Sequence, residues 1–194
     1  MSQYRALPLF PLPSHVLPGG RMALRIFEPR YLRMVKESYN GTNGFAICML
    51  NEQGSVDANQ HIWPIATRVQ IVDFTPLEDG LLGLTVEGVE RIEIGSIQTQ
   101  WDGLRVADAS ALPNWPEQPV SAEHTQAKDC LKRVFDDYPE LHSLYPQPHF
   151  DDASWVALRW LELVPLPGNE KQVLYRHADA GPTLTMLSSL LEKH

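Results

Sequence analysis

The sequence lacks any apolar run approaching about 20 residues, the length that a membrane-spanning helix needs. Its first ten residues, MSQYRALPLF, contain no basic segment followed by a long apolar one, so we expect no secretory signal. Cys48 and Cys130 are the two cysteines, and they stand far apart without a CxxC spacing. They predict two buried thiols in a reducing compartment. These absences favour a cytoplasmic location and no membrane partner.

Positive charge is also scarce. Sixteen Lys and Arg residues face 24 Asp and Glu residues, giving a formal net charge of -8. A general nucleic-acid binder needs a basic face for phosphate contacts, so this composition disfavours one. The seven histidines are scattered, with no H-E-x-x-H or comparable spacing, and therefore predict no metal site.

Signatures of catalysis are missing as well. No G-x-x-x-x-G-K-[ST] loop is present to hold nucleotide phosphates, and no G-x-S-x-G segment presents a nucleophile. Ser188, Ser189 and Lys193 lie near one another, but a Ser–Lys dyad needs a desolvated lysine, and Lys193 is next to the last residue. We therefore expect no catalytic residues, no cofactor and no enzymatic activity.

The sequence does contain an ordinary globular composition, 43% hydrophobic and 21% charged, whose pattern changes near residue 120. Before that point, short runs rich in Val, Ile, Thr and aromatics predict strands. These runs cover 22–27, 45–50, 61–74, 81–100 and 104–110, with hairpin turn signals at Asp79-Gly80 and Asp102-Gly103. After the proline-rich stretch 112–121, the pattern predicts helices, so the expected fold class is α+β.

One helix is expected in the first half, beginning at Pro29, whose fixed φ suits a first helical position. Leu32, Val35 and Tyr39 would share one face, and Gly41 would end the helix in the left-handed region. In the second half Ser121 and Asp179 are expected to cap helices, and Trp155 and Trp160 are expected in the core.

The segment RIFEPRY, residues 25–31, admits three interpretations: a catalytic Glu–Arg pair, a clamp for an anion, or a joint between a strand and a helix. We favour the joint. Glu28 precedes Pro29, where its carboxylate could accept a free helical amide and complement the helix dipole. Arg30 would bind a carboxylate or strand carbonyls, while Phe27 and Tyr31 would pack inward. A general base would need a raised pKa, and an adjacent arginine lowers it.

Three blocks carry a family resemblance. LPLFPLPSHVLPGGRMALRIFEPRYLRMV resembles the start of the substrate-binding domain of Lon-type ATP-dependent proteases. ATRVQIVDFTPLEDGLLGLTVEGVERIEI is similar to that family's central hairpin with its G-x-x-R, and WLELVPLPGNEKQVLYRHADAGPTLTMLSSLLE to its helical tail. Segment 111–152 shows no recognisable likeness.

The resemblance implies a PUA-like β-pseudobarrel with one packed helix, followed by a helical subdomain. The expected boundaries are 1–118 for the β-rich part and 119–194 for the helices, together one domain. The family motif residues, Glu28, Pro29, Arg30, Tyr31, Gly88 and Arg91, would be structural. The chain would be a free-standing, non-catalytic interaction module without the ATPase and protease modules.

The implied partners are unfolded or extended polypeptides or a partner protein, with a role as an adaptor in protein quality control. A weak homo-oligomer is compatible with the sequence. If exposed, Trp63, Trp101 and Trp115 would help form an apolar patch able to hold a polypeptide.

The alternative is RNA binding, because PUA-like folds in other families contact RNA. It would use the arginines and lysine of residues 21–36, although the acidic total makes nucleic acid the less favoured partner.

Overall fold

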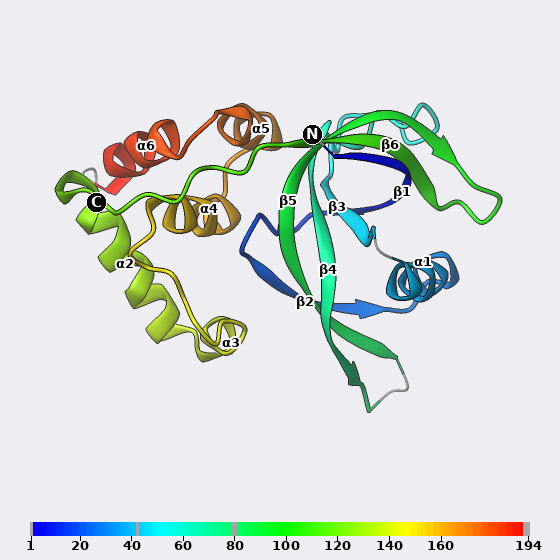
Figure 1. The fold of residues 1–194 in the computed structure, drawn as a ribbon, viewed down its shortest axis with the longest axis horizontal. Coiled ribbons are helices and arrows are strands. Elements are labelled where there is room, and N and C mark those ends of the chain that lie inside the picture. The colour runs from blue at the N-terminus through cyan, green and yellow to red at the C-terminus, as the bar shows by residue number, and fades with distance from the viewer. Residues whose placement is uncertain (1, 42, 79–80, 192–194) are drawn as a thin grey trace. The chain divides into compact units, whose positions relative to one another are not determined.

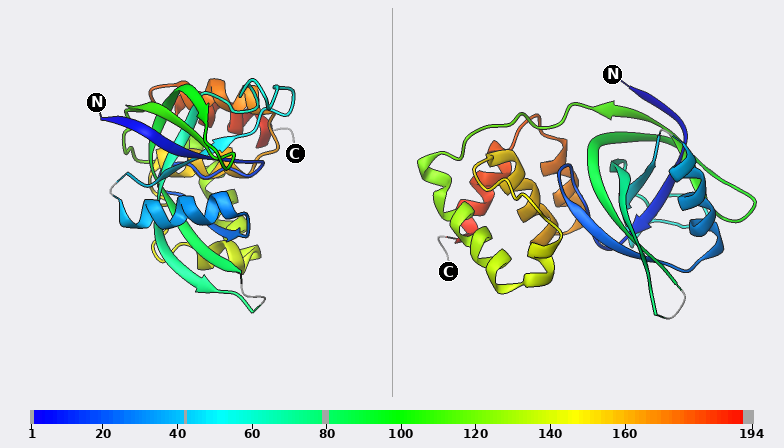
Figure 2. Two further views of the ribbon diagram at one scale, coloured as in Figure 1. Left: turned by 90° about the vertical axis from the view of Figure 1, so that its right-hand side faces the viewer. Right: turned by 60° about the horizontal axis from the view of Figure 1, so that its bottom comes forward.

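The computed structural model describes residues 2–41, 43–78 and 81–191. The chain divides into two compact units, residues 1–113 and residues 114–194 (Figures 1 and 2). Strands and one helix make up the first unit, and helices make up the second. The α+β class is therefore confirmed. The boundary expected at residue 118 stays a prediction.

The strands of the first unit form one partly closed ring. Its elements are β1 (Gln3–Leu12), β2 (Arg21–Ile26), α1 (Pro29–Asn40), β3 (Phe45–Met49), β4 (Ile65–Pro76), β5 (Leu82–Thr99) and β6 (Arg105–Leu112). The sheet order is β2-β5-β4-β3-β1-β6, and β6 pairs with β5 again, which closes the ring. β1 and β3 run parallel, whereas the other paired strands are antiparallel. This is the predicted pseudobarrel.

The first strand was not predicted, because Pro8 and Pro11 lie within it. A proline cannot donate a ladder hydrogen bond, so its presence argues against a strand. β1 nevertheless pairs with β6 around Pro8 and with β3 around Pro11. Leu7 and Leu9 are 1% and 0% exposed, and their burial anchors the strand despite the missing donors.

The turn between β5 and β6 follows the prediction made from Asp102-Gly103. Gly103 has φ +86, which glycine adopts without strain, and its N–H donates to the Gln100 carbonyl at 2.9 Å. The turn predicted at Asp79-Gly80 lies outside the described residues.

α1 begins at Pro29 as predicted, but a different face of it is buried. Met34 and Val35 pack into the main core of the unit, and Tyr31 packs against that core. Of the three residues predicted to share one face, Val35 is buried, whereas Leu32 and Tyr39 are 41% and 67% exposed. The helix also ends differently, because Gly41 has φ -104 and is extended, not left-handed.

The second unit contains η1 (Ala122–His124), α2 (Thr125–Asp137), α3 (Pro139–Ser143), α4 (Ala153–Leu163), α5 (Gly168–Arg176) and α6 (Gly181–Leu191). Its core is largely aromatic, with Trp155 packed against Phe135 and Tyr145. Trp155 is buried as predicted, whereas Trp160 is half-buried and donates its ring N–H to the Ala127 carbonyl at 2.9 Å.

Two expected helix caps of the second unit differ in outcome. The Ser121 side chain makes no capping hydrogen bond, so that expectation is wrong. Before α6, the Asp179 carboxylate accepts the Gly181 N–H at 2.8 Å, as expected. A further cap precedes α4, where the Asp152 carboxylate accepts the amides of Ser154 and Trp155.

Candidate functional site

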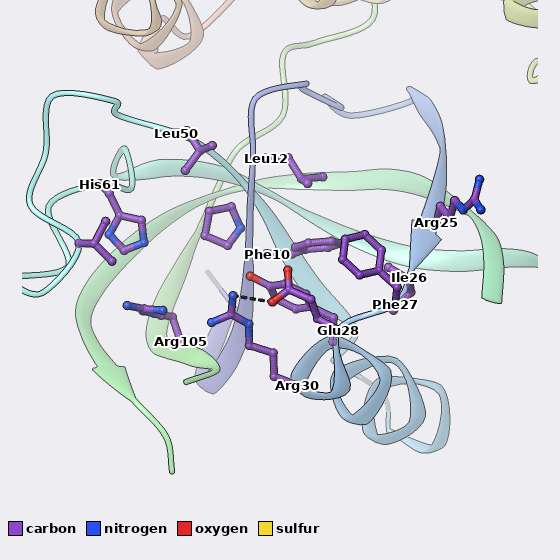
Figure 3. A pocket seen from close by; sticks show the side chains of 13 residues that line it. Phe10, Leu12, Arg25, Ile26, Phe27, Glu28, Arg30, Leu50, His61 and Arg105 are labelled. Carbon is purple, nitrogen blue, oxygen red and sulfur yellow. Dashed lines mark ion pairs between the residues drawn. The ribbon is translucent and has the colours of Figure 1, made fainter. Parts of the chain in front are cut away.

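A pocket of about 390 Å³ lies where β1 ends beside the junction of β2 and α1 (Figure 3). Its lining comes from four segments: Phe10, Pro11 and Leu12 of β1; Arg25, Ile26, Phe27, Glu28, Arg30 and Tyr31 of the β2–α1 junction; Leu50, Val56 and His61 between β3 and β4; and Arg105 of β6. Most of the RIFEPRY segment therefore faces this pocket. Sequence reasoning did not identify Phe10, His61 or Arg105, because residues so far apart give no local signal.

The RIFEPRY segment joins β2 to α1 mainly through its backbone. The Glu28 carbonyl accepts the N–H groups of Tyr31 and Leu32, each at 3.0 Å. The Glu28 side chain makes no capping hydrogen bond, which corrects the expectation that its carboxylate caps the helix. It forms instead an ion pair with Arg30 at 2.7 Å, and both side chains line the pocket.

The two aromatics of this segment both line the pocket but differ in burial. Tyr31 packs on Phe10 with ring centroids 4.2 Å apart, as predicted. Phe27 is 63% exposed, so its expected inward packing is wrong. The preceding Ile26 is 1% exposed, and side chains alternate between the two faces of a strand. Burying Ile26 therefore turns Phe27 outward, at the pocket.

The polar side of the pocket is built around Arg105. Its Nε donates to Asn59 Oδ1 at 3.2 Å and its Nη1 to the Gly103 carbonyl at 3.1 Å. Arg30 Nη1 donates to the same carbonyl at 3.3 Å. The His61 side chain is buried, and its pKa is lowered by burial and by the charge of Arg105. His61 is therefore neutral at pH 7.

Gly88 and Arg91, the other family motif residues, lie outside this pocket. The N–H of Gly88 donates to the Gly20 carbonyl and its carbonyl accepts from Gly19, both at 2.9 Å. A Cβ on Gly88 would stand 2.3 Å from the Leu17 carbonyl oxygen, so a larger residue does not fit. Arg91 is buried, and its guanidinium donates to the Pro113 carbonyl. These contacts support a structural role for both.

The three tryptophans named as candidates differ in exposure, and none lines the pocket. Trp101 is 87% exposed at the β5–β6 turn, with the Arg33 guanidinium 5.5 Å from its ring centroid. Trp63 is half-buried. Trp115 is 6% exposed and donates its ring N–H to the His177 carbonyl at 2.7 Å. Trp115 is thus not exposed as the hypothesis required, whereas the roles of Trp63 and Trp101 stay predictions.

The other candidate groups offer little chemistry. Burial strongly raises the pKa of the Cys48 thiol, which keeps the thiol protonated. Cys130 was expected to be buried, but it is half-buried. Ser189 donates to the Thr185 carbonyl, and Lys193 lies outside the described residues.

Within residues 2–41, 43–78 and 81–191, no three His, Cys, Asp or Glu side chains are grouped so that they could hold a metal ion. In that same part of the chain, every helix is too short or too polar to span a bilayer.

Comparison with known proteins places this pseudobarrel within one family. The sequence model of the "ATP-dependent protease La (LON) substrate-binding domain" matches residues 6–193. The chain therefore belongs to the Lon substrate-binding domain family. The match includes segment 111–152, for which the sequence alone showed no likeness.

Two solved structures have a similar fold. A Lon N-terminal domain protein from Xanthomonas campestris is 28% identical, with a TM-score of 0.74, over 97% of this chain and 98% of that one. The N-terminal domain of a Lon protease from the Mycobacterium avium complex has a TM-score of 0.67 over all of both chains. At 14% identity, this second likeness concerns the fold alone. No curated protein sequence matched the chain significantly.

Proposed function

We propose that this protein binds unfolded or extended polypeptide without altering it, and that the RIFEPRY pocket is the binding site. The observation that carries this proposal is the position of Phe27, a large aromatic side chain 63% exposed beside a pocket with further apolar lining. Val56, on another segment of the lining, is 54% exposed. An apolar surface gathered at a pocket is typical of a site that takes an apolar partner.

The edge of the sheet offers a second kind of contact. β2 is the terminal strand in the sheet order and pairs along its length with β5. Arg25 and Ile26, at the end of β2, line the pocket. An extended peptide could add to this strand by backbone hydrogen bonds while one of its side chains enters the pocket. Such contacts are tolerant of sequence, as a substrate-recruiting module requires.

The family supports a recruiting role and not a catalytic one. The family model that matches this chain describes a substrate-binding domain. We propose that the protein works in the cytoplasm as a recruiting or adaptor module in protein quality control, with a separate ATPase or protease. Cys48 and Cys130 are free thiols, which agrees with a reducing compartment.

RNA binding, the alternative, is less well supported by the side chains that it would need. In the basic cluster of residues 21–36, Arg21 pairs with Glu87, Arg30 with Glu28, and Arg33 with Asp102 and Glu37. A guanidinium already paired with a carboxylate gains little from a phosphate, because the existing pair must first be broken.

The proposal is tested by fluorescence anisotropy with the full chain. The labelled ligand is reduced, carboxymethylated α-lactalbumin, which stays unfolded, and native α-lactalbumin serves as the folded control. We expect binding of the unfolded ligand alone, and we expect Phe27→Ser to weaken it about tenfold, since the ring loses its apolar contact. Tyr39→Ser is the matched control, because Tyr39 is 67% exposed and packs on Phe74 away from the pocket lining.

Three results would contradict the proposal. Failure of the unfolded ligand to bind at about 100 µM, a very weak affinity, would refute polypeptide binding. Equal affinities of wild type and Phe27→Ser would place the site elsewhere. Cleavage of the ligand by a pure preparation would refute the non-catalytic part.

A further inference from the structure

The pocket is positively charged although the protein as a whole is acidic. The chain carries a formal net charge of -8, yet three arginines and one glutamate line the pocket. The remaining titratable side chains of the lining, His61 and Tyr31, are uncharged at pH 7, because burial lowers the pKa of His61 and raises that of Tyr31. The lining therefore has more positive than negative charge, which favours a ligand with a negative group.

Two of these arginines are held together. Arg30 and Arg105 donate to one acceptor, the Gly103 carbonyl, at 3.3 and 3.1 Å. Figure 3 shows both side chains at the same side of the pocket, with Glu28 paired to Arg30. The two oxygens that accept from Arg105, on Asn59 and Gly103, are neutral. One carboxylate thus faces two neighbouring guanidinium groups, and like charges so close repel each other.

A buried donor remains in the same place. The Nε of Arg30 is buried and makes no hydrogen bond within the described part of the chain. A buried polar atom without a partner is costly, so a ligand that supplied an oxygen here would relieve that cost.

The apolar lining adjoins this charged side. Phe10, Leu12 and Leu50 line the same pocket, and Phe27 and Val56 add exposed apolar surface. The volume of about 390 Å³ lies at the small end of the range for ligand pockets, about 300–1,000 Å³. The ligand should therefore be short, with one apolar side chain next to one carboxylate.

We propose that the pocket takes the C-terminal residue of a polypeptide, with its free carboxylate on Arg105, whose present acceptors are neutral, and its apolar side chain among Phe10, Leu12 and Phe27. This assignment rests on the proposed function and narrows it to chain ends. Arg30, Arg105 and Glu28 together carry one excess positive charge, which a single carboxylate balances, whereas Glu28 at the same site disfavours a more highly charged phosphate chain. A small free carboxylic acid shares the chemistry, so the test must separate the two sources.

The test uses the full chain and short peptides labelled with fluorescein at the N-terminus and ending Gly-Ser-Leu-Leu. One peptide has a free C-terminal carboxylate, the second a C-terminal amide, and the third has a free carboxylate but serine in place of both leucines. We expect the amide and the serine peptide each to bind about tenfold more weakly or worse, because each lacks one of the two contacts. This comparison needs no variant of the protein.

A variant locates the site. Arg105→Gln should bind the acid and the amide with equal affinity, since the group that distinguishes them is gone. Lys36→Gln is the matched control, because it removes one exposed positive charge of the same unit outside the pocket, and it should keep the wild-type preference. Circular dichroism checks that each variant is folded.

Several results would overturn this inference. Equal affinities of the wild type for the acid and amide peptides would refute the chain-end site while leaving polypeptide binding intact. If neither the peptides nor unfolded α-lactalbumin bind, both the chain-end site and polypeptide binding are refuted. Unchanged discrimination by folded Arg105→Gln would place the carboxylate elsewhere. Competition by 4-methylpentanoate as strong as by the acid peptide would indicate a small acid, and displacement by oligo-U would indicate a phosphate site.

Discussion

A buried ion pair in the second unit leads to a sharp prediction about stability. Glu162 accepts two hydrogen bonds from Arg159, at 2.7 and 2.8 Å, and the two side chains are 12% and 1% exposed. Glu162 also opposes the effect of burial on Lys171, whose pKa is lowered because its side chain is buried. Replacing Glu162 by glutamine would leave the buried Arg159 guanidinium without a charged partner on its own helix.

The expected cost is about 3–5 kcal/mol in the free energy of unfolding, the usual penalty for removing one partner of a buried pair. Glu37→Gln is the matched control, since Glu37 pairs with Arg33 at 3.2 Å but is 55% exposed. An exposed pair of this spacing contributes about 0.3–0.5 kcal/mol. Both variants are compared with wild type by urea unfolding, followed by circular dichroism at the helix band.

A double substitution tests the reason for the loss. Arg159→Met with Glu162→Leu removes both charges and keeps apolar contact with Trp155, over whose ring Arg159 now lies at 5.3 Å. We expect this variant to be more stable than Glu162→Gln, because the Arg159 charge is removed together with its partner, while Lys171 loses the Glu162 charge in both variants. If Glu162→Gln costs no more than Glu37→Gln, the Arg159 charge is not desolvated and the reasoning is wrong.

Two further predictions concern the first unit and the thiols. Gly88→Ala should lower the free energy of unfolding in urea by about 1–3 kcal/mol, because its Cβ would meet the Leu17 carbonyl. Gly41→Ala should lower it less, because its Cβ would lie 3.2 Å from the nearest oxygen. A larger loss for Gly41→Ala than for Gly88→Ala would refute this explanation. Iodoacetamide should label Cys130 well before Cys48 in the native protein, because burial raises the pKa of the Cys48 thiol and shields it from the reagent. Equal labelling rates of the two cysteines, measured by mass spectrometry, would contradict this prediction.

The parts of the fold that the sequence predicted depend on local chemistry. Pro29 sets the start of α1, and Gly103 permits the left-handed turn between β5 and β6. The strand β1 was missed because Pro8 and Pro11 argue against a strand, while the burial of its leucines overrides that preference. The sequence pattern did not predict α3, a helix of five residues.

The candidate site was predicted only in part, because it is assembled from distant segments. RIFEPRY was recognised as a special segment, and an anion clamp was among its three interpretations. Its partners in the pocket, Phe10, His61 and Arg105, come from three other parts of the chain, and no spacing rule connects them. The outward direction of Phe27 followed from the strand ending at Ile26, one residue earlier than predicted.

The most direct test of polypeptide binding at this pocket is a titration of the ¹⁵N-labelled full chain with the unlabelled acid peptide, followed by amide chemical shifts. The account predicts that the largest changes fall in residues 9–12, 25–31 and 50–61 and at Arg105, the segments that line the pocket. Changes confined to residues 114–194, or no changes at peptide concentrations that saturate the anisotropy signal, would contradict it.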